Sequence, residues 1–257
     1  MSWGLIYDVS GTDLMNAFLR KLECYAPLNE ADSVLIGSLT DKTRLVARRT
    51  DLVREGDPTN VVHIILEGFG VRYKMVGNGT RQIFSYLVPG DICDLHVALL
   101  AEMDHTVSTL SDCVVAEIHR PSILNIVAER PALLRALWWT MLVDEAVLRE
   151  WITNIGARNA DLRIAHLLCE IHARLDAIGL VSEGIFSLPI TQQELGDTVG
   201  LSIVQVNRSL KTIRERGLAR FRKHLIDIPD IRRMQEFADF NESYLHLRSS
   251  PRSRSAR

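Results

Sequence analysis

The stretch at residues 190–221, ITQQELGDTVGLSIVQVNRSLKTIRERGLARF, decides the fold, because it carries the signals of two short helices and the turn between them. Thr191, with Glu194 three residues later, forms the capping-box pattern and predicts a helix that begins there. Gly200 permits a tight turn, and Ser202 is a good N-cap for the second helix. Together these signals predict a helix-turn-helix.

The second predicted helix has an apolar face and a polar face. Val206, Leu210 and Ile213 share the inward face by helical spacing. Polar side chains on the opposite face can read base edges in a major groove. Arg208 lies at the centre of that face, and arginine is the commonest reader of guanine. The predicted DNA-binding residues are Gln192, Gln193, Ser202, Ile203, Val204, Gln205, Asn207, Arg208, Lys211, Arg222 and Lys223.

Basic residues follow the second helix and favour contact with phosphates. Gly217 stops that helix, and two short strands at residues 218–221 and 225–228 are joined by Arg222-Lys223-His224, which predicts a wing. Residues 157–257 have a net charge of +4, whereas residues 1–156 have a net charge of −6. A cationic C-terminal part suits a nucleic-acid backbone. We assign phosphate contacts to the wing cations and to the two glutamines at the start of the first helix.

Short strands dominate the first part of the chain. Residues 61–66, 71–76, 81–87 and 114–118 are rich in β-branched and aromatic side chains. Gly77-Asn78-Gly79 and Pro89-Gly90-Asp91 are turn signals between them. This spacing predicts an all-β sandwich or roll. Ahead of the strands, Asn29 is the predicted N-cap of a helix.

From residue 132 to residue 155 the apolar spacing becomes helical, with steps of three and four residues. The β-domain alone cannot bury a helix of this length, so we expect it to pair with its twin in a homodimer. Asp144 and Glu145 interrupt the apolar stripe. A second amphipathic helix is expected at residues 161–176. The stripe consists of Leu134, Leu137, Trp138, Met141, Leu148, Trp151, Ile152 and Ile155.

The length of 257 residues suits two modest domains. We expect an N-terminal extension (1–24), a sensor β-roll (25–125), a dimerisation helix (126–156), a winged helix-turn-helix domain (157–240) and a disordered basic tail (241–257). No apolar run approaches the ~20 residues of a membrane span. The four cysteines are scattered, as is typical of reduced thiols. The expected location is the cytoplasm, with no membrane partner.

The order of these signals resembles the Crp/Fnr family. Glu55-Gly56-Asp57 precedes IILEGFGVRYKMVGNGTRQIFSYLVPGDI at residues 64–92, and a long helix and the helix-turn-helix follow. The resemblance covers residues 25–240 and implies an α+β fold: an N-terminal double-stranded β-helix of the jelly-roll type, a dimerisation helix and a C-terminal winged helix-turn-helix. It implies a bacterial homodimeric transcription regulator, not an enzyme, which binds an inverted repeat in double-stranded DNA, contacts RNA polymerase and senses a small-molecule effector.

Two departures from the family pattern bear on ligands and operator. Members that bind cyclic AMP have a Gly-Glu pair and an Arg-Ser or Arg-Thr pair, whereas here Asp94 and Leu95 stand near the first and His105 and Thr106 near the second. A neutral imidazole cannot replace a bidentate guanidinium on a phosphate. We therefore predict an effector pocket at these four residues that does not take cyclic AMP. On the second helix, Ile203 and Val204 replace the family's charged pair while Arg208 matches its reading arginine, so the operator should differ.

Other cofactors and functions are not favoured. The family's iron–sulfur members have clustered N-terminal cysteines, and only Cys24 stands in that region. A haem at His96 or His63 would rest on a lone histidine, and no metal site is predicted. A cupin-like oxygenase would need two histidines and a carboxylate on iron, but His63, His96 and His105 lack the His-x-His spacing. The other alternative function is a ligand-responsive β-roll module that does not bind DNA.

Overall fold

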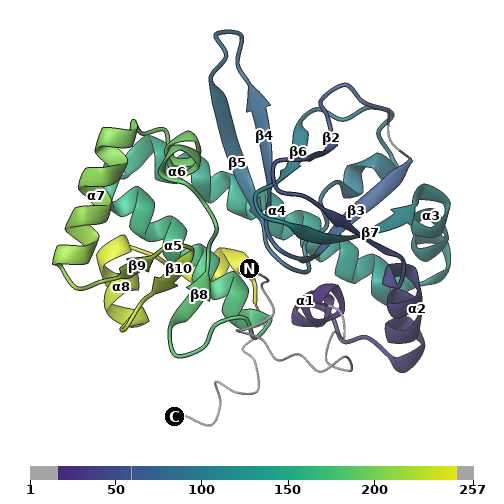
Figure 1. Ribbon diagram of the computed structural model, residues 1–257. Helices are drawn as coiled ribbons and strands as arrows, with labels where there is room; N and C mark the ends of the chain where they lie inside the picture. The colour runs from purple at the N-terminus through teal and green to yellow at the C-terminus, as the bar shows by residue number, and fades with distance from the viewer. Residues whose placement is uncertain (1–16, 59, 248–257) are drawn as a thin grey trace.

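Figure 1 shows the computed structural model, which describes residues 17–58 and 60–247 of the chain. The sensor half begins with two helices, α1 (Ala17–Tyr25) and α2 (Glu30–Thr40). The predicted N-cap of α2 is confirmed, since the side chain of Asn29 accepts a hydrogen bond from the backbone N–H of Asp32 at 2.8 Å.

Seven strands of the sensor half form two antiparallel sheets, as predicted for a β-roll. One sheet has the order β1-β7-β3 and the other β2-β6-β4-β5. Fully buried valine and isoleucine side chains from both sheets, such as Val62, Ile64, Val107 and Val115, share one apolar core. The elements are β1 (Thr43–Val46), β2 (Asp51–Val53), β3 (Val61–Glu67), β4 (Gly70–Met75), β5 (Arg81–Leu87), the 3-10 helix η1 (Leu95–Ala98), β6 (Thr106–Thr109) and β7 (Cys113–His119).

The long helix begins later than the sequence boundary at residue 126 suggests. That boundary falls inside a separate helix, α3 (Arg120–Glu129), and the long helix is α4 (Pro131–Ala157). Arg130 separates them with φ −127° and ψ 78°. The residue before a proline is disfavoured in the helical region because of the proline ring, so Pro131 ends α3 and starts α4.

The C-terminal half is a winged helix-turn-helix packed on α5 (Ala160–Ala177). Its small sheet has the antiparallel order β8-β10-β9. The elements are β8 (Ile185–Ser187), α6 (Gln192–Val199), α7 (Ile203–Glu215), β9 (Arg220–Arg222), β10 (Leu225–Asp227), α8 (Ile231–Ala238) and the 3-10 helix η2 (Glu242–Leu245). Across the described residues, no helix is both long and apolar enough to cross a membrane.

The two predicted terminal segments are more structured than expected. The extension at 1–24 contains most of α1, whose Phe18, Leu19 and Leu22 are buried against the sensor core. Gly90 makes this packing possible, because a Cβ there would lie 2.4 Å from the carbonyl oxygen of Ala17. At the other end, η2 contradicts a disordered tail from residue 241. Residues 1–16 and 248–257 lie outside the described part of the chain.

The two halves share an apolar core, which the division into separate domains did not predict. Tyr86 of β5 is fully buried and packs edge-on against Trp151 of α4, with ring centroids 5.8 Å apart. Ile83 of β5, Val147 of α4 and Leu168 of α5 belong to the same cluster. A change in how the sensor sheets pack on α4 therefore shifts the helices that carry the DNA-binding motif.

The packing of the C-terminal elements on α5 predicts instability in acid. His166 is 1% exposed and lies against Phe240, with ring centroids 5.0 Å apart. Burial, with a smaller contribution from Arg158, lowers the pKa of His166 to about 3. The unfolded chain, with a histidine pKa of about 6.5, takes up a proton below that pH and the folded chain does not, so folding stability falls as pH falls.

We expect this one histidine to cost about 1.4 kcal/mol of unfolding free energy between pH 7.5 and pH 5.5. Urea unfolding at both pH values measures the loss. The variant His166→Phe keeps a ring in the same cluster but cannot be protonated, so its loss should be smaller by about that amount. Equal losses in the two proteins would contradict this assignment.

Candidate nucleic-acid interface and sensor site

The turn between α6 and α7 is built by the residues that the sequence singles out. The hydroxyl of Thr191 accepts the backbone N–H of Glu194 at 3.1 Å, and the carboxylate of Glu194 accepts the backbone N–H of Thr191 at 2.7 Å. Gly200 ends α6 with φ 67°, in the left-handed region. Gly196 lets the two helices approach, since a Cβ there would lie 2.6 Å from the carbonyl oxygen of Leu201.

A second capping box starts α7, and the sequence analysis missed it. The side-chain oxygen Oε1 of Gln205 accepts hydrogen bonds from the backbone N–H and the hydroxyl of Ser202, at 3.0 and 2.9 Å. The signal was present as Ser-x-x-Gln, which is a capping-box pattern. Because its oxygen is occupied, Gln205 has only its amide N–H groups left for a base edge, and it cannot make the bidentate contact with adenine in this position.

The outward face of α7 is exposed over its whole length. Val206 and Ile213 are fully buried and fix the opposite face against the motif, and Leu210 is partly buried. The guanidinium of Arg208 makes no hydrogen bond or ion pair with any described residue. Lys211 lies 3.6 Å from Glu215 on the exposed surface. Exposed positions on this face are Ser202, Ile203, Val204, Gln205, Asn207, Arg208 and Lys211.

The wing is the hairpin between β9 and β10. Its first strand begins at Arg220 and not at residue 218, because Leu218 and Ala219 are buried beneath it. Arg222 and Lys223 are exposed at the tip. Lys223 has φ 52°, a conformation that a tight two-residue hairpin requires. The hairpin therefore presents two cations to the solvent.

The start of α6 is exposed but partly engaged. Gln192 and Gln193 are both exposed, and the amide of Gln193 donates to Asp197 at 2.7 Å. Asp197 also binds Arg81 of β5 at 2.8 Å. The side-chain amide of Gln192 is thus available to bind a phosphate. The amide of Gln193 can bind one only after its hydrogen bond to Asp197 breaks.

The helix-turn-helix is held against the sensor sheet through α6. Besides the Arg81–Asp197 ion pair, Gln82 of β5 donates to the carbonyl oxygen of Thr198 at 3.1 Å. The hydroxyls of Tyr86 and Thr198 lie 2.6 Å apart, and both residues are buried. Figure 1 shows α6 next to β5, so the sensor and the DNA-binding motif are in direct contact.

A buried network of charged groups joins the same two halves behind this contact. Arg174 of α5 donates to Asp91 at 2.6 Å, and Asp91 belongs to the Pro-Gly-Asp turn of the sensor. Another nitrogen of the Arg174 guanidinium lies 3.3 Å from a carboxylate oxygen of Glu170. Glu170 also accepts hydrogen bonds from Trp151 of α4 at 2.9 Å and Tyr244 of η2 at 2.8 Å. Burial raises the pKa of Glu170, and Arg174 opposes that shift.

The four residues predicted to line the effector pocket do not form one open pocket. Asp94 is fully buried, and its two carboxylate oxygens accept from the backbone N–H and the ring Nδ1 of His63, at 2.7 and 2.6 Å. Both of its oxygens are therefore engaged by His63, and the carboxylate is not accessible to a ribose hydroxyl. Thr106 is buried and accepts from the backbone N–H of Glu55 at 3.1 Å. Leu95 opens η1 and is half-buried.

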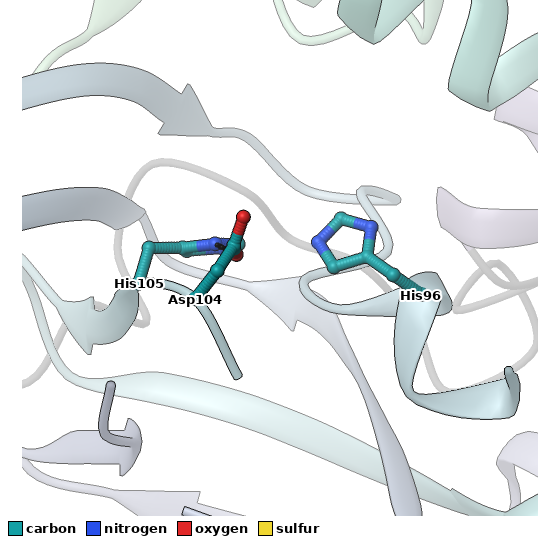
Figure 2. A group of neighbouring side chains, drawn as sticks. All are labelled: His96, Asp104 and His105. Carbon is teal, nitrogen blue, oxygen red and sulfur yellow. Dashed lines mark hydrogen bonds and ion pairs between the residues drawn. The ribbon is translucent and has the colours of Figure 1, made fainter. Parts of the chain in front are cut away.

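The two segments do converge, through a residue that the pocket prediction left out. His96 of η1 faces His105 at the start of β6, with ring centroids 5.4 Å apart (Figure 2). Nδ1 of His105 lies 2.5 Å from a carboxylate oxygen of Asp104. Burial lowers the pKa of both histidines, and the bond to His105 lowers the pKa of Asp104. At neutral pH the site holds two neutral imidazoles beside one carboxylate.

Part of the apolar stripe on α4 is left uncovered. Leu137 and Trp151 are buried within the protomer, whereas Trp138 and Ile152 are 61% and 73% exposed. Asp144 is not in this exposed row, because it turns toward the sensor and binds Arg72 at 2.9 Å. Glu145 is exposed and does interrupt this row of apolar side chains. The uncovered apolar residues of this row are Trp138, Met141, Leu142, Leu148 and Ile152.

Known protein families match both halves. The model of the cyclic nucleotide-binding domain matches residues 43–130, and the model of the Crp-like helix-turn-helix domain matches residues 162–237. In this order, with α4 between them, the two matches cover well over half of the chain. The chain belongs to the Crp/Fnr family of transcription regulators. It is a DNA-binding regulator with an N-terminal sensory domain, as the sequence predicted.

Several relatives of this Crp/Fnr regulator align over most of their own length. The nitrogen fixation regulation protein FixK of Bradyrhizobium diazoefficiens is 26% identical over 63% of this chain and 68% of the relative. The anaerobic regulatory protein of Haemophilus influenzae is 22% identical over 86% and 85%. The solved structure of FixK2 from Bradyrhizobium japonicum superposes with a TM-score of 0.69 at 22% identity, over 76% of this chain and 96% of that one.

The cysteines of this Crp/Fnr regulator are placed as structural thiols. They come from four separate regions of the fold, and Cys93, Cys113 and Cys169 are buried. Burial raises the pKa of Cys113 to about 11 and that of Cys169 to about 12. His63, which was considered as a haem ligand, donates its ring Nδ1–H to a carboxylate oxygen of Asp94 and is 7% exposed.

Proposed function

We propose that the protein is a homodimer that binds an inverted-repeat operator through the outward face of α7. The single observation that carries this proposal is the free guanidinium of Arg208 at the centre of an exposed helix face, beside a cationic wing. Arginine in this position can bind the two acceptors of guanine in the major groove. Gln192 of α6 and the wing residues Arg222 and Lys223 supply phosphate contacts that fix the helix in the groove.

The uncovered row on α4 supports the homodimer. A protomer that exposes Trp138 and Ile152 on one helix leaves an apolar strip in water, and pairing with a second copy buries it. A twofold axis along α4 relates two copies of α7, so they would read successive major grooves about one helical turn apart. We further propose that the regulator works in the cytoplasm and contacts RNA polymerase.

Genome-wide footprinting with the purified protein tests the proposal. We expect protected segments upstream of genes that share one inverted-repeat motif. The double variant Arg208→Ala/Lys211→Ala should lose this shared motif while keeping salt-sensitive, sequence-independent binding through the wing. Protection without a shared motif in the wild-type protein would contradict the proposal.

We also propose that cyclic nucleotides are not the effector, and we expect no heat in calorimetric titration with cyclic AMP or cyclic GMP. The carboxylate of Asp94 is engaged by His63. At position 105 the protein has a neutral imidazole, whereas binding of a phosphate would need a guanidinium. Arg72, the buried arginine of β4, is committed to Asp144 and to two backbone carbonyl groups. Binding at micromolar cyclic AMP would show that this part of the sensor rearranges to form a different pocket.

A further inference from the structure

The cluster of His96, Asp104 and His105 is not used by the proposed DNA-binding function. Ligand atoms of the three side chains, one from each, lie within 4.8 Å of one another. Figure 2 shows the ring of His96 reaching from η1 toward Asp104 and His105, which precede β6. His105 follows His96 by nine positions in the sequence, so the fold and not a local motif brings them together.

From this geometry we infer that His96, Asp104 and His105 bind one divalent first-row transition metal ion. Two imidazole nitrogens and one carboxylate oxygen form the ligand set of many zinc and iron(II) sites. The remaining positions would be filled by water or an incoming ligand. Magnesium and calcium favour sites made entirely of oxygen ligands, so they do not fit this set.

A polar atom that the protein leaves unsatisfied supports the inference. His105 is 5% exposed, and its Nε2 has no hydrogen-bond partner among the described residues. A buried nitrogen without a partner costs about 1–3 kcal/mol, and an absent ion is one of its recognised explanations. Because histidine can bind a metal through either nitrogen, the ring is not yet fully used by the contact with Asp104.

The site is wider than a closed metal site and has to contract when an ion binds. Ligand atoms on a tetrahedral zinc ion are about 3.3 Å apart, given bond lengths near 2 Å. The ligand atom of His96 therefore has to approach those of the other two residues by up to about 1.5 Å. The chain after η1 does not oppose this shift, because Leu99 and Leu100 are 80% and 51% exposed and hold η1 down by little packing. Thr106, bonded to Glu55, keeps the other side fixed.

Calorimetric titration of Zn²⁺ into tag-free, chelator-treated full-length protein tests the inference without DNA, so it does not depend on any operator. We expect one ion per protomer with micromolar or tighter affinity, and no binding of Mg²⁺. Co²⁺ should give a visible absorption spectrum typical of nitrogen and oxygen ligands. The variants His96→Gln, His105→Gln and Asp104→Asn should each weaken Zn²⁺ binding by at least about tenfold.

Asp104→Asn is the decisive variant, because the side chain of Asp104 is 73% exposed and asparagine keeps its size and an acceptor oxygen for His105. The matched control is His119→Gln, which removes an exposed histidine elsewhere in the sensor and should bind Zn²⁺ like the wild type. The inference is overturned if the wild type binds neither Zn²⁺ nor Co²⁺ at micromolar concentration. It is also overturned if Asp104→Asn and His96→Gln bind with unchanged affinity.

Discussion

Replacing Ile152 by aspartate is expected to turn the dimer into a monomer. Ile152 is 73% exposed on α4 within one protomer, so the substitution leaves the protomer's own core intact. In the dimer it would bury an unpaired carboxylate from each chain near the twofold axis. The desolvation of such a charge costs several kcal/mol, which corresponds to a loss of at least about 100-fold in dimer affinity.

Sedimentation at micromolar concentration measures this effect. The wild type should have twice the protomer mass of 29.0 kDa, and Ile152→Asp should have the protomer mass. The control Leu45→Asp introduces the same charge at a leucine that is 85% exposed on β1, outside the α4 row, and should remain dimeric. A dimeric Ile152→Asp protein would place the interface elsewhere on the molecule.

Replacing Arg208 by alanine is expected to cost about 1–3 kcal/mol of binding free energy per half-site, or about 5- to 150-fold in affinity. The loss arises because the guanidinium has no partner in the protein and is free to bind a base edge. Selectivity should relax at one base position, repeated symmetrically in the other half-site. Fluorescence anisotropy with operators that vary at each position measures both effects.

Lys223→Ala is the matched control for the Arg208 substitution. Lys223 lies at the wing tip, where we assign a phosphate contact, so its loss should weaken all sequences alike. It should also lower the slope of log affinity against log salt by about one per subunit. If Arg208→Ala leaves the base preference unchanged, the recognition face is assigned wrongly, and Ile203 and Val204 become candidates for contact with thymine methyl groups.

The parts of the fold that depend on local chemistry were predictable from the sequence. Thr191, Gly200 and Ser202 act within a few residues of themselves, so their patterns located both helices of the motif. The strands β3, β4, β5 and β7 and the turns between them followed from the same kind of signal, whereas β1, β2 and β6 were not predicted. The break at Arg130 was also encoded locally, by Pro131, but the domain boundary was placed at residue 126, inside α3.

Contacts between distant segments were not predictable in this way. The exposed fraction distinguishes Trp138 from Leu137, and that difference depends on where the sensor sheets meet α4. Asp94 was assigned to a pocket because its position resembles a ligand-binding acid, but His63, 31 residues earlier, occupies it. His96 and His105 were weighed as metal ligands and set aside because they lack the His-x-His spacing, since their proximity depends on how η1 folds back toward β6.

The contact between α6 and the sensor shows how an effector signal could reach the DNA-binding motif. Arg81, Gln82 and Tyr86 of β5 hold α6 directly, while Asp91 and Arg174 hold α5. Because the two halves share one apolar core, a shift of the sensor sheets would move α6 and α7 together.

Selection of operators from randomised double-stranded DNA by the purified protein tests the central claim most directly. Two copies of α7 related by a twofold axis predict an inverted repeat with half-site centres about one helical turn apart. Each half-site should contain a guanine whose enrichment is lost in Arg208→Ala. Enrichment of a single half-site, of a direct repeat, or of no sequence would contradict the account.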